Sequence, residues 1–269
     1  MDGDGDGTST HRSWVPRSML LGVVGLLLFA AFLELVPRLL RLPADVLPPL
    51  SSILGALAVE VVTAGFWQAV GDTLVQWLLG LAIAAVAGVG VGVVVGAVPL
   101  LRRVTASTIE FLRPIPSVAL VPLAVLLFGT QLRSALVLIV YASFWQVLVQ
   151  TLYGVADVDP VADQTARSYG LGRWARVRYV LWPTAKPYVA TGLRLAASVA
   201  LILAVTAELV IGSPGLGREI TAAQSGGATA TAYGLIIVTG LFGLVVNVGV
   251  RAVERRALRW HVSVRGETV

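Results

Sequence analysis

One acidic side chain inside a long apolar run is the first candidate for chemistry in this sequence. Glu208 is the single charged residue of the stretch 195–217. If this stretch crosses a bilayer, burying the carboxylate costs several kcal/mol, which makes Glu208 a functional candidate. It either lines or gates a solute path near the outer surface, or it accepts hydrogen bonds from backbone amides in the turn 211–217. On a straight helix it shares a face with Ala197, Leu201 and Ala204, so we expect that face to point into protein.

Three glutamines lie in other apolar runs and are candidates for the same path. Gln76, Gln146 and Gln150 are neutral, so each of them either contacts a solute or forms hydrogen bonds with a neighbouring helix. The sequence leaves both interpretations open, and the same two interpretations apply to Asn247. The candidate translocation path therefore comprises Glu208, Gln76, Gln146 and Gln150.

Several kinds of chemistry are excluded by residues that the chain lacks. It has no cysteine, and His11 and His261 both lie in the terminal segments, so we predict no metal site and no catalytic residue. Asp2, Asp4 and Asp6 resemble the start of a calcium loop, but Ser13 stands where that loop needs a glutamate. A phosphate-binding loop is also absent, because the only lysine, Lys186, follows an alanine. We predict that the chain is not an enzyme and that energy comes from another polypeptide or from an ion gradient.

The composition is that of a membrane protein. Hydrophobic residues make up 57% of the 269 residues and charged residues only 13%, against roughly 25% charged in soluble domains. The formal charge of +5 does not indicate nucleic-acid binding, because the basic residues lie at the ends of apolar runs, where the polar boundary of a bilayer falls.

Six apolar segments are each close to the roughly 20 residues that a helix needs to cross the hydrocarbon core. They predict an all-α membrane protein with spans at 19–36, 73–98, 109–128, 133–153, 187–211 and 233–250. Residues 18–260 form the transmembrane domain, residues 1–17 a disordered tail and residues 261–269 a second tail. Residues 37–72 read as an outer loop with an interfacial helix.

The basic residues set the orientation of these spans. With a cytoplasmic amino terminus, only Arg38, Arg41, Arg133 and Arg218 lie outside. The other sixteen are inside: Arg12, Arg17, Arg102, Arg103, Arg113, Arg167, Arg173, Arg176, Arg178, Lys186, Arg194, Arg251, Arg255, Arg256, Arg259 and Arg265. We therefore predict a multi-pass protein of the bacterial plasma membrane with both termini in the cytoplasm.

Small residues and prolines predict how two of the spans are built. Gly80, Ala84, Gly88, Gly92 and Gly96 recur every four residues and form a ridge on which another helix can pack closely. In the third span, the segment 113–116 (Arg-Pro-Ile-Pro) and a further proline at position 122 predict a broken or kinked helix. Such a break is tolerated in a membrane only where protein or water satisfies the freed carbonyls.

The largest cytoplasmic connection, residues 154–186, predicts two short helices. Asp159 and Pro160 are typical of a helix start, and Gly170 suits the left-handed residue that ends a helix. A second, basic and aromatic helix follows at 173–182, which we expect Pro183 to stop. The loop is either a mechanical contact for a cytoplasmic partner or an amphipathic segment that lies on anionic lipid headgroups.

At this loop the chain resembles the permease subunits of binding-protein-dependent ABC importers. Their hallmark is E-A-A, three residues, G, a dozen residues and then L-P. Ala166, Gly170 and Pro183 match it, whereas Gln164, Thr165 and the residue before Pro183 differ. Within the family, the nitrate, taurine and aliphatic sulfonate subgroup is most similar, through segments 111–116, 122–129, 158–160, 187–194, 207–208 and 215–217.

This resemblance implies a type I ABC importer permease fold and a set of partners. A cytoplasmic ABC ATPase dimer would receive the coupling helix, with Asp159, Pro160, Gln164, Thr165, Ala166, Gly170 and Pro183 as the coupling residues. A second permease copy, giving a homodimer, and an extracytoplasmic solute-binding protein would complete the importer in the lipid bilayer. ATP and Mg²⁺ would be bound by the ATPase, and this chain would hold no cofactor.

The implied function is transport of a small anionic solute such as a sulfonate, taurine or nitrate. The alternative is a secondary transporter that an ion gradient drives. That class needs paired acidic groups or two similar halves, and the sequence shows neither a partner for Glu208 nor a repeat. The identity of the solute is not determined by this chain.

Overall fold

The computed structural model describes residues 17–258, and the regular elements within this range are all helices. They are α1 (Arg17–Leu39), α2 (Leu50–Glu60), α3 (Ala64–Ala97), α4 (Pro99–Leu112), η1 (Ser117–Leu120), α5 (Val121–Phe128), α6 (Leu132–Ala156), α7 (Pro160–Ser168), α8 (Arg173–Arg176), η2 (Val177–Leu181), α9 (Trp182–Ile211), α10 (Leu216–Ser225) and α11 (Thr229–Ala257). The predicted all-α class is confirmed. The tails predicted at 1–17 and 261–269 lie outside the described residues, apart from Arg17.

Five helical segments in this range are long and apolar enough to cross a membrane, and a bent pair raises the number to six. The straight spans are contributed by α1, α3, α6, α9 and α11. The sixth consists of α4 together with the segment Ser117–Phe128, and its two halves meet at 83°. The prediction of six spans is therefore met when this pair counts as one.

The bend occurs at the predicted break. Residues 113–116 separate α4 from η1, and Pro122 lies in the first turn of α5. The Leu112 carbonyl lacks its usual donor four residues on, because Pro116 has no N–H, and it accepts bonds from the Ile115 N–H at 3.2 Å and the Tyr141 hydroxyl at 2.7 Å instead. Protein thus satisfies the exposed end of α4. The predicted start of this span at 109 is wrong, because the helix already begins at Pro99.

α3 also begins earlier than predicted, at Ala64 rather than at residue 73. Thr63 caps it by accepting a hydrogen bond of 3.1 Å from the Phe66 backbone N–H. The loop predicted at 37–72 is shorter as a result, but the helix expected inside it is present as α2. Hydrogen bonds to Glu34 link α2 to α1: the Glu34 carboxylate accepts from the Ser51 N–H at 2.9 Å and from the Ser51 hydroxyl at 3.0 Å.

Close packing of α6 between α3 and α9 forms the centre of the bundle. The small ridge on α3 faces α6, as an added Cβ at Gly88 would lie 2.8 Å from Val147 and one at Gly92 would lie 2.7 Å from Thr151. On the other side of α6, an added Cβ at Gly192 of α9 would lie 2.9 Å from the Gln150 Cβ. The prediction that another helix packs closely on the ridge is confirmed, and α6 is that helix.

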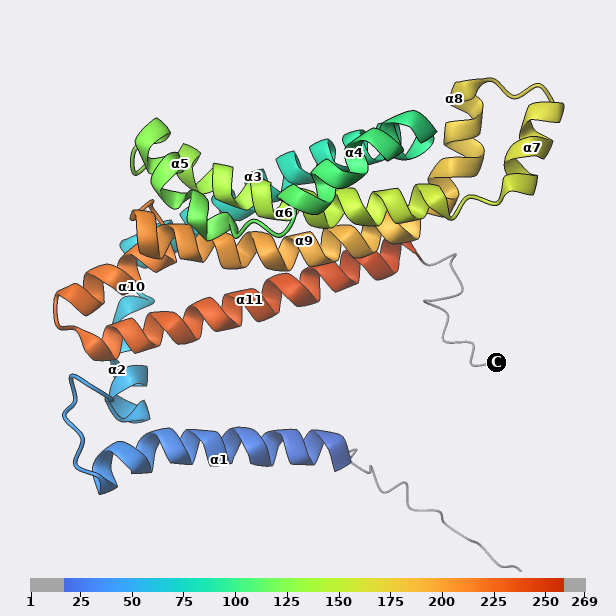
Figure 1. Ribbon diagram of the computed structural model, residues 1–269. Coiled ribbons are helices and arrows are strands. Elements are labelled where there is room, and N and C mark those ends of the chain that lie inside the picture. Colours follow the sequence, from blue (N-terminus) through green and yellow to red (C-terminus); the bar gives the residue numbers. More distant parts are fainter. Residues whose placement is uncertain (1–16, 259–269) are drawn as a thin grey trace, which may run out of the picture.

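The ends of the described chain lie at one end of this bundle (Figure 1). α1 begins and α11 finishes at the end that carries α7 and α8, while the turn between α9 and α10 lies at the opposite end (Figure 1). An even number of spans requires this arrangement.

Candidate functional site: the loop 154–186 and a buried polar cluster

Helix α7 has a defined start and a defined end. The Asp159 side chain accepts a hydrogen bond of 2.8 Å from the Val161 N–H, and Pro160 occupies the first helical position. At the other end Gly170 has a φ of +74°, and the Leu171 N–H bonds to the Ala166 carbonyl at 3.0 Å. This i to i−5 bond across a left-handed glycine is the Schellman ending. The predicted roles of Asp159, Pro160 and Gly170 as helix boundaries are confirmed.

The two faces of α7 differ in exposure. Gln164 and Thr165 are exposed, whereas Ala166 is 7% exposed and packs against the rest of the chain. Gln164 and Thr165 are therefore available to a partner, and Ala166 holds the helix in place instead. In Figure 1, α7 lies beyond the end of the bundle, on the far side of α8.

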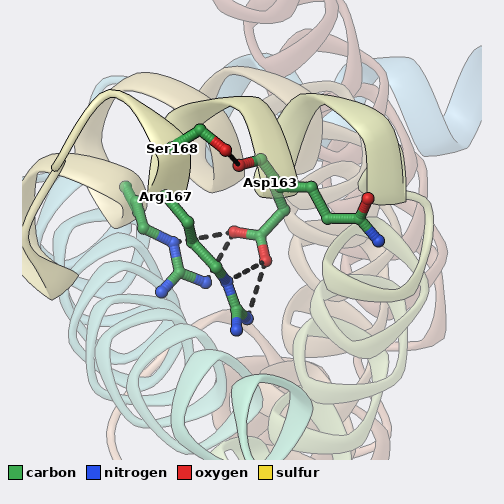
Figure 2. A network of polar contacts seen from close by, with 5 residues as sticks. Asp163, Arg167 and Ser168 are labelled. Carbon is green, nitrogen blue, oxygen red and sulfur yellow. Dashed lines mark hydrogen bonds and ion pairs between the residues drawn. The ribbon is translucent and has the colours of Figure 1, made fainter.

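An ion-pair cluster that the sequence analysis missed holds α7 to α8. Asp163 of α7 accepts bonds from Arg176 of α8 at 2.8 and 2.5 Å and from Arg167 of α7 at 3.1 and 2.9 Å. Figure 2 shows each oxygen of the Asp163 carboxylate bonded to one of two neighbouring guanidinium groups, one of them that of the labelled Arg167. The hydrogen bonds from Arg176 lower the pKa of Asp163 below its ordinary 3.8. The four-residue spacing of Asp163 and Arg167 could have predicted their ion pair on one face of the helix, but no sequence pattern predicts the pair of Asp163 with Arg176.

The connection from α8 into α9 corrects one prediction. Pro183 does not stop the second short helix but lies in the first turn of α9, and the segment Val177–Leu181 has the wider turn of a π-helix. A proline removes the N–H that an α-helix needs at that position, and a π turn shifts the bonding so that the chain continues. α8, η2 and α9 therefore form a continuous helical segment from the loop 154–186 into the bundle.

At the opposite end, Glu208 and Gln76 meet in a buried polar cluster with the turn that joins α9 to α10. Glu208 is 0% exposed, and its carboxylate accepts bonds from the Gly217 N–H at 2.9 Å and from Gln76 Nε2 at 3.2 Å. Gln76 Nε2 also donates to the Pro214 carbonyl, and its Oε1 accepts from the Ser213 hydroxyl at 3.2 Å. This geometry matches the second interpretation of Glu208, in which it accepts a bond from a backbone amide of the turn.

Further residues complete the cluster. The Thr73 hydroxyl, on α3 one turn before Gln76, accepts a bond of 3.0 Å from the Leu216 N–H. The turn approaches so closely that an added Cβ at Gly215 would lie 2.2 Å from the Glu208 carboxylate. Thr73 and Ser213 were not predicted, because a bond between residues 143 positions apart leaves no local trace in sequence.

The two remaining path candidates lie elsewhere. Gln146 and Gln150 are half-buried on α6, where Gly192 of α9 crosses them. Gly192 precedes Glu208 by sixteen residues of one helix, or roughly 24 Å at 1.5 Å per residue. The structure thus brings Glu208 and Gln76 together but leaves Gln146 and Gln150 nearer the middle of the bundle.

These features define a class of protein, a multi-span transporter subunit. Its broken span and the capped helix at one end are suited to contact with a separate subunit that supplies energy. Residues 80–259 match the model of the family described as "Binding-protein-dependent transport system inner membrane component", and the chain belongs to this family. It is a permease component of an ABC importer, as the resemblance implied, and it is a multi-pass inner membrane protein.

Known proteins agree on the class and on the fold. The chain is 34% identical over 236 residues to the taurine transport system permease protein TauC of Escherichia coli (strain K12), covering 87% of this chain and 85% of the relative. It is 28% identical over 193 residues to the nitrate import permease protein NrtB of Leptolyngbya laminosa, covering 72% and 69%. A solved chain of the MetNI methionine ABC transporter in an inward-facing conformation superposes with a TM-score of 0.61 at 18% identity, covering 72% of this chain and 96% of that chain. The type I importer permease fold is confirmed.

Proposed function

We propose that two copies of this chain form the translocation path of an ATP-driven importer and that each α7 inserts into a groove of a cytoplasmic ABC ATPase dimer. The observation that carries the proposal is the geometry of α7, which is capped at both ends, lies beyond the bundle and is fixed to α8 through Asp163. A displacement of α7 by the ATPase would move α8 and α9 with it. ATP and Mg²⁺ are bound by the ATPase in this scheme, and this chain holds no cofactor.

The coupling residues have different tasks in this proposal. Gln164 and Thr165 form the contact surface, because they are exposed on α7. Asp159, Pro160 and Gly170 fix where the helix begins and ends, and Ala166 anchors its inner face. Pro183, in the first turn of α9, marks where the segment enters the bundle.

The proposed solute is a small anion such as taurine, another sulfonate or nitrate, delivered by an extracytoplasmic binding protein. The names of the relatives TauC and NrtB support this chemistry. We propose that the path passes Gln146 and Gln150, whose half-buried amides can hydrogen-bond an anion. Glu208 and Gln76 shape the outer end of the path, because their cluster fixes the turn between α9 and α10.

The proposed orientation places both termini and α7 in the cytoplasm of a bacterium. It is supported by the arginine-rich composition of the end that carries α7, where Arg167, Arg173, Arg176 and Arg178 lie. Membrane lipid surrounds the bundle and covers the exposed apolar side chains of α1, such as Leu27, which is 63% exposed.

The test is reconstitution of the purified permease into vesicles with its ATPase and binding protein. We expect uptake of labelled taurine or nitrate to require ATP, the ATPase and the loaded binding protein together. Exposed substitutions on α7, such as Thr165→Glu, should reduce co-purification of the ATPase, whereas the control Thr221→Glu, at an exposed position of α10 at the opposite end of the bundle, should leave it unchanged. Uptake by the permease alone, driven by an ion gradient, would contradict the proposal.

A further inference from the structure

A basic and aromatic groove lies between the coupling helix and the start of α9. It has a volume of about 520 Å³ and is lined by Trp174, Ala175, Val177, Arg178 and Trp182. Binding sites for small molecules fall in the range of roughly 300 to 1,000 Å³, so the groove can hold a compact polar group with a short length of hydrocarbon.

The positive charge beside this groove is not neutralised by an ion pair within the part of the chain that the structure describes. Arg173 and Arg178 are exposed, and neither has an ion-pair partner within residues 17–258. Arg176, by contrast, is paired with Asp163. The Arg178 guanidinium lies 5.8 Å from the centre of the Tyr179 ring. The free guanidinium groups therefore favour an anionic ligand.

The aromatic side chains around these arginines are unusually exposed. Trp174 is 83% exposed, Tyr179 66% and Trp182 40%. Indole and phenol rings have an apolar body and a polar edge, and in membrane proteins they concentrate at the level of the lipid headgroups. Such a ring beside a guanidinium suits a ligand that is charged at one end and apolar at the other.

The position of the groove along the chain points to the same level of the membrane. Trp182 is the first residue of α9, which runs on as an apolar span, and α7 lies on the other side of α8 (Figure 1). The groove is thus on the bundle side of the coupling helix, where the chain passes from the polar to the apolar layer. A lipid reaches this level, whereas a cytoplasmic protein meets α7 first.

We propose that this groove binds the headgroup of an anionic phospholipid. The phosphate lies against Arg178, which lines the groove, while Arg173, the residue before Trp174, adds positive charge next to it. The upper part of the acyl chains lies against Trp174 and Trp182. A lipid bound there would attach the segment between α7 and α9 to the membrane surface. The inference rests on the proposed function only for the side of the membrane on which the groove lies.

Tryptophan quenching by brominated lipids in nanodiscs tests this proposal on the full-length permease. Phosphatidylcholine discs contain either brominated phosphatidylglycerol or brominated phosphatidylcholine at the same mole fraction, and the contribution of Trp174 is the difference between the wild type and Trp174→Phe. At about fivefold per arginine beside an anionic headgroup, two arginines correspond to roughly 25-fold enrichment of the anionic lipid. We expect several-fold stronger quenching of Trp174 by the brominated phosphatidylglycerol.

The double variant Arg173→Gln/Arg178→Gln should remove that difference. The matched control Arg255→Gln/Arg256→Gln removes the same charge from the exposed end of α11 and should keep it. Equal quenching by the two lipids, or equal loss in both double variants, would overturn the proposal. So would a double variant that loses the ATPase but retains the lipid preference, since the groove would then contact protein. ATPase co-purification is a separate assay, whereas the quenching measurement requires neither ATPase nor transport, so a negative quenching result leaves the proposed function standing.

Discussion

Two carboxylates, Glu208 and Asp163, show how the same chemical group acts differently in different surroundings. Glu208 is fully buried and accepts hydrogen bonds from the turn before α10. Asp163 has a side chain that is 25% exposed and pairs with arginines at the polar end of the molecule. Removing a buried acceptor leaves its donors unpaired, which lowers the free energy of unfolding by more than the loss of a partly exposed ion pair does. Such an ion pair contributes about 1 kcal/mol or less. The two sites should therefore respond differently to substitution.

Replacing Glu208 separates hydrogen bonding from charge. In Glu208→Gln the amide oxygen still accepts from the Gly217 N–H, so we expect the free energy of unfolding in detergent to fall by only about 1 kcal/mol. Glu208→Leu leaves the Gly217 N–H and one N–H of Gln76 unpaired, so we expect a loss of roughly 2 to 5 kcal/mol. If both variants retain wild-type stability and both lose uptake, the carboxylate charge acts in the path instead.

A double-mutant cycle measures the link between α7 and α8. Asp163→Ala and Arg176→Ala should each lower ATP-driven uptake and ATPase co-purification, and the double variant should lose no more than either single variant. We expect a coupling free energy of about 1 kcal/mol or less, because the pair is partly exposed. Arg255→Ala on α11 is the control, since Arg255 is exposed and is not paired with Asp163 in any described ion pair.

The pH dependence of this link follows from the lowered pKa of Asp163. A carboxylate whose folded pKa lies below the unfolded value stabilises the fold fully above the ordinary 3.8 and loses that contribution as the pH falls through the folded pKa. The coupling free energy between Asp163 and Arg176 should therefore be the same at about pH 5 and at about pH 8, because both lie roughly one pH unit or more above 3.8. A coupling energy that fell between pH 8 and pH 6 would show that Asp163 is not the ionised partner.

At the scale of elements, the ends of α7 determine whether the helix can transmit movement. Gly170 has a φ of +74°, which a residue with a Cβ adopts only under strain. No atom lies within 4 Å of an added Cβ there, so the penalty is conformational and amounts to about 1 kcal/mol. Strain of this size can tilt α7 without unfolding the bundle.

Gly170→Val is accordingly expected to leave membrane insertion intact and to weaken ATPase co-purification and its stimulation by the loaded binding protein. Gly170→Asn should be milder, since asparagine tolerates the left-handed region better than other residues with a Cβ. The control is Gly172→Val, two residues further on, where φ is −63° and an added Cβ also meets open space. If Gly172→Val is as damaging as Gly170→Val, the left-handed ending is not the cause.

At the scale of the whole molecule, the bundle has two ends with different chemistry. One carries α7, the ion pairs of Asp163 and both ends of the described chain, and the other carries the turn fixed by Glu208 (Figure 1). The lack of cysteine allows single reporter cysteines to assign these ends to the two sides of the membrane.

Gln224→Cys and Ser168→Cys should label from opposite sides of intact cells. Both positions are exposed, on α10 and α7 respectively. An impermeant thiol reagent applied from outside should modify the cysteine at position 224 and spare the one at position 168 until the membrane is permeabilised. The reverse pattern would place α7 outside and contradict coupling to a cytoplasmic ATPase.

The sequence alone determined the class of fold, most of the spans and the ends of α7, because these depend on local composition. Apolar length, the cap at Asp159, the left-handed Gly170 and the prolines of the broken span all act within a few residues of themselves. Span boundaries were less accurate, as with α3, whose cap at Thr63 precedes the apolar run.

Only the tertiary structure decided which distant residues meet. The bond of Glu208 with Gln76 and the pairing of Asp163 with Arg176 join different helices, and their geometry depends on how those helices cross. The ridge of small residues on α3 predicted that some helix packs closely against it. Only the close fit of Gly88 against Val147 in the structure identified α6 as that helix. Local preferences fix a helix and its ends, whereas contacts between helices depend on packing that no single segment encodes.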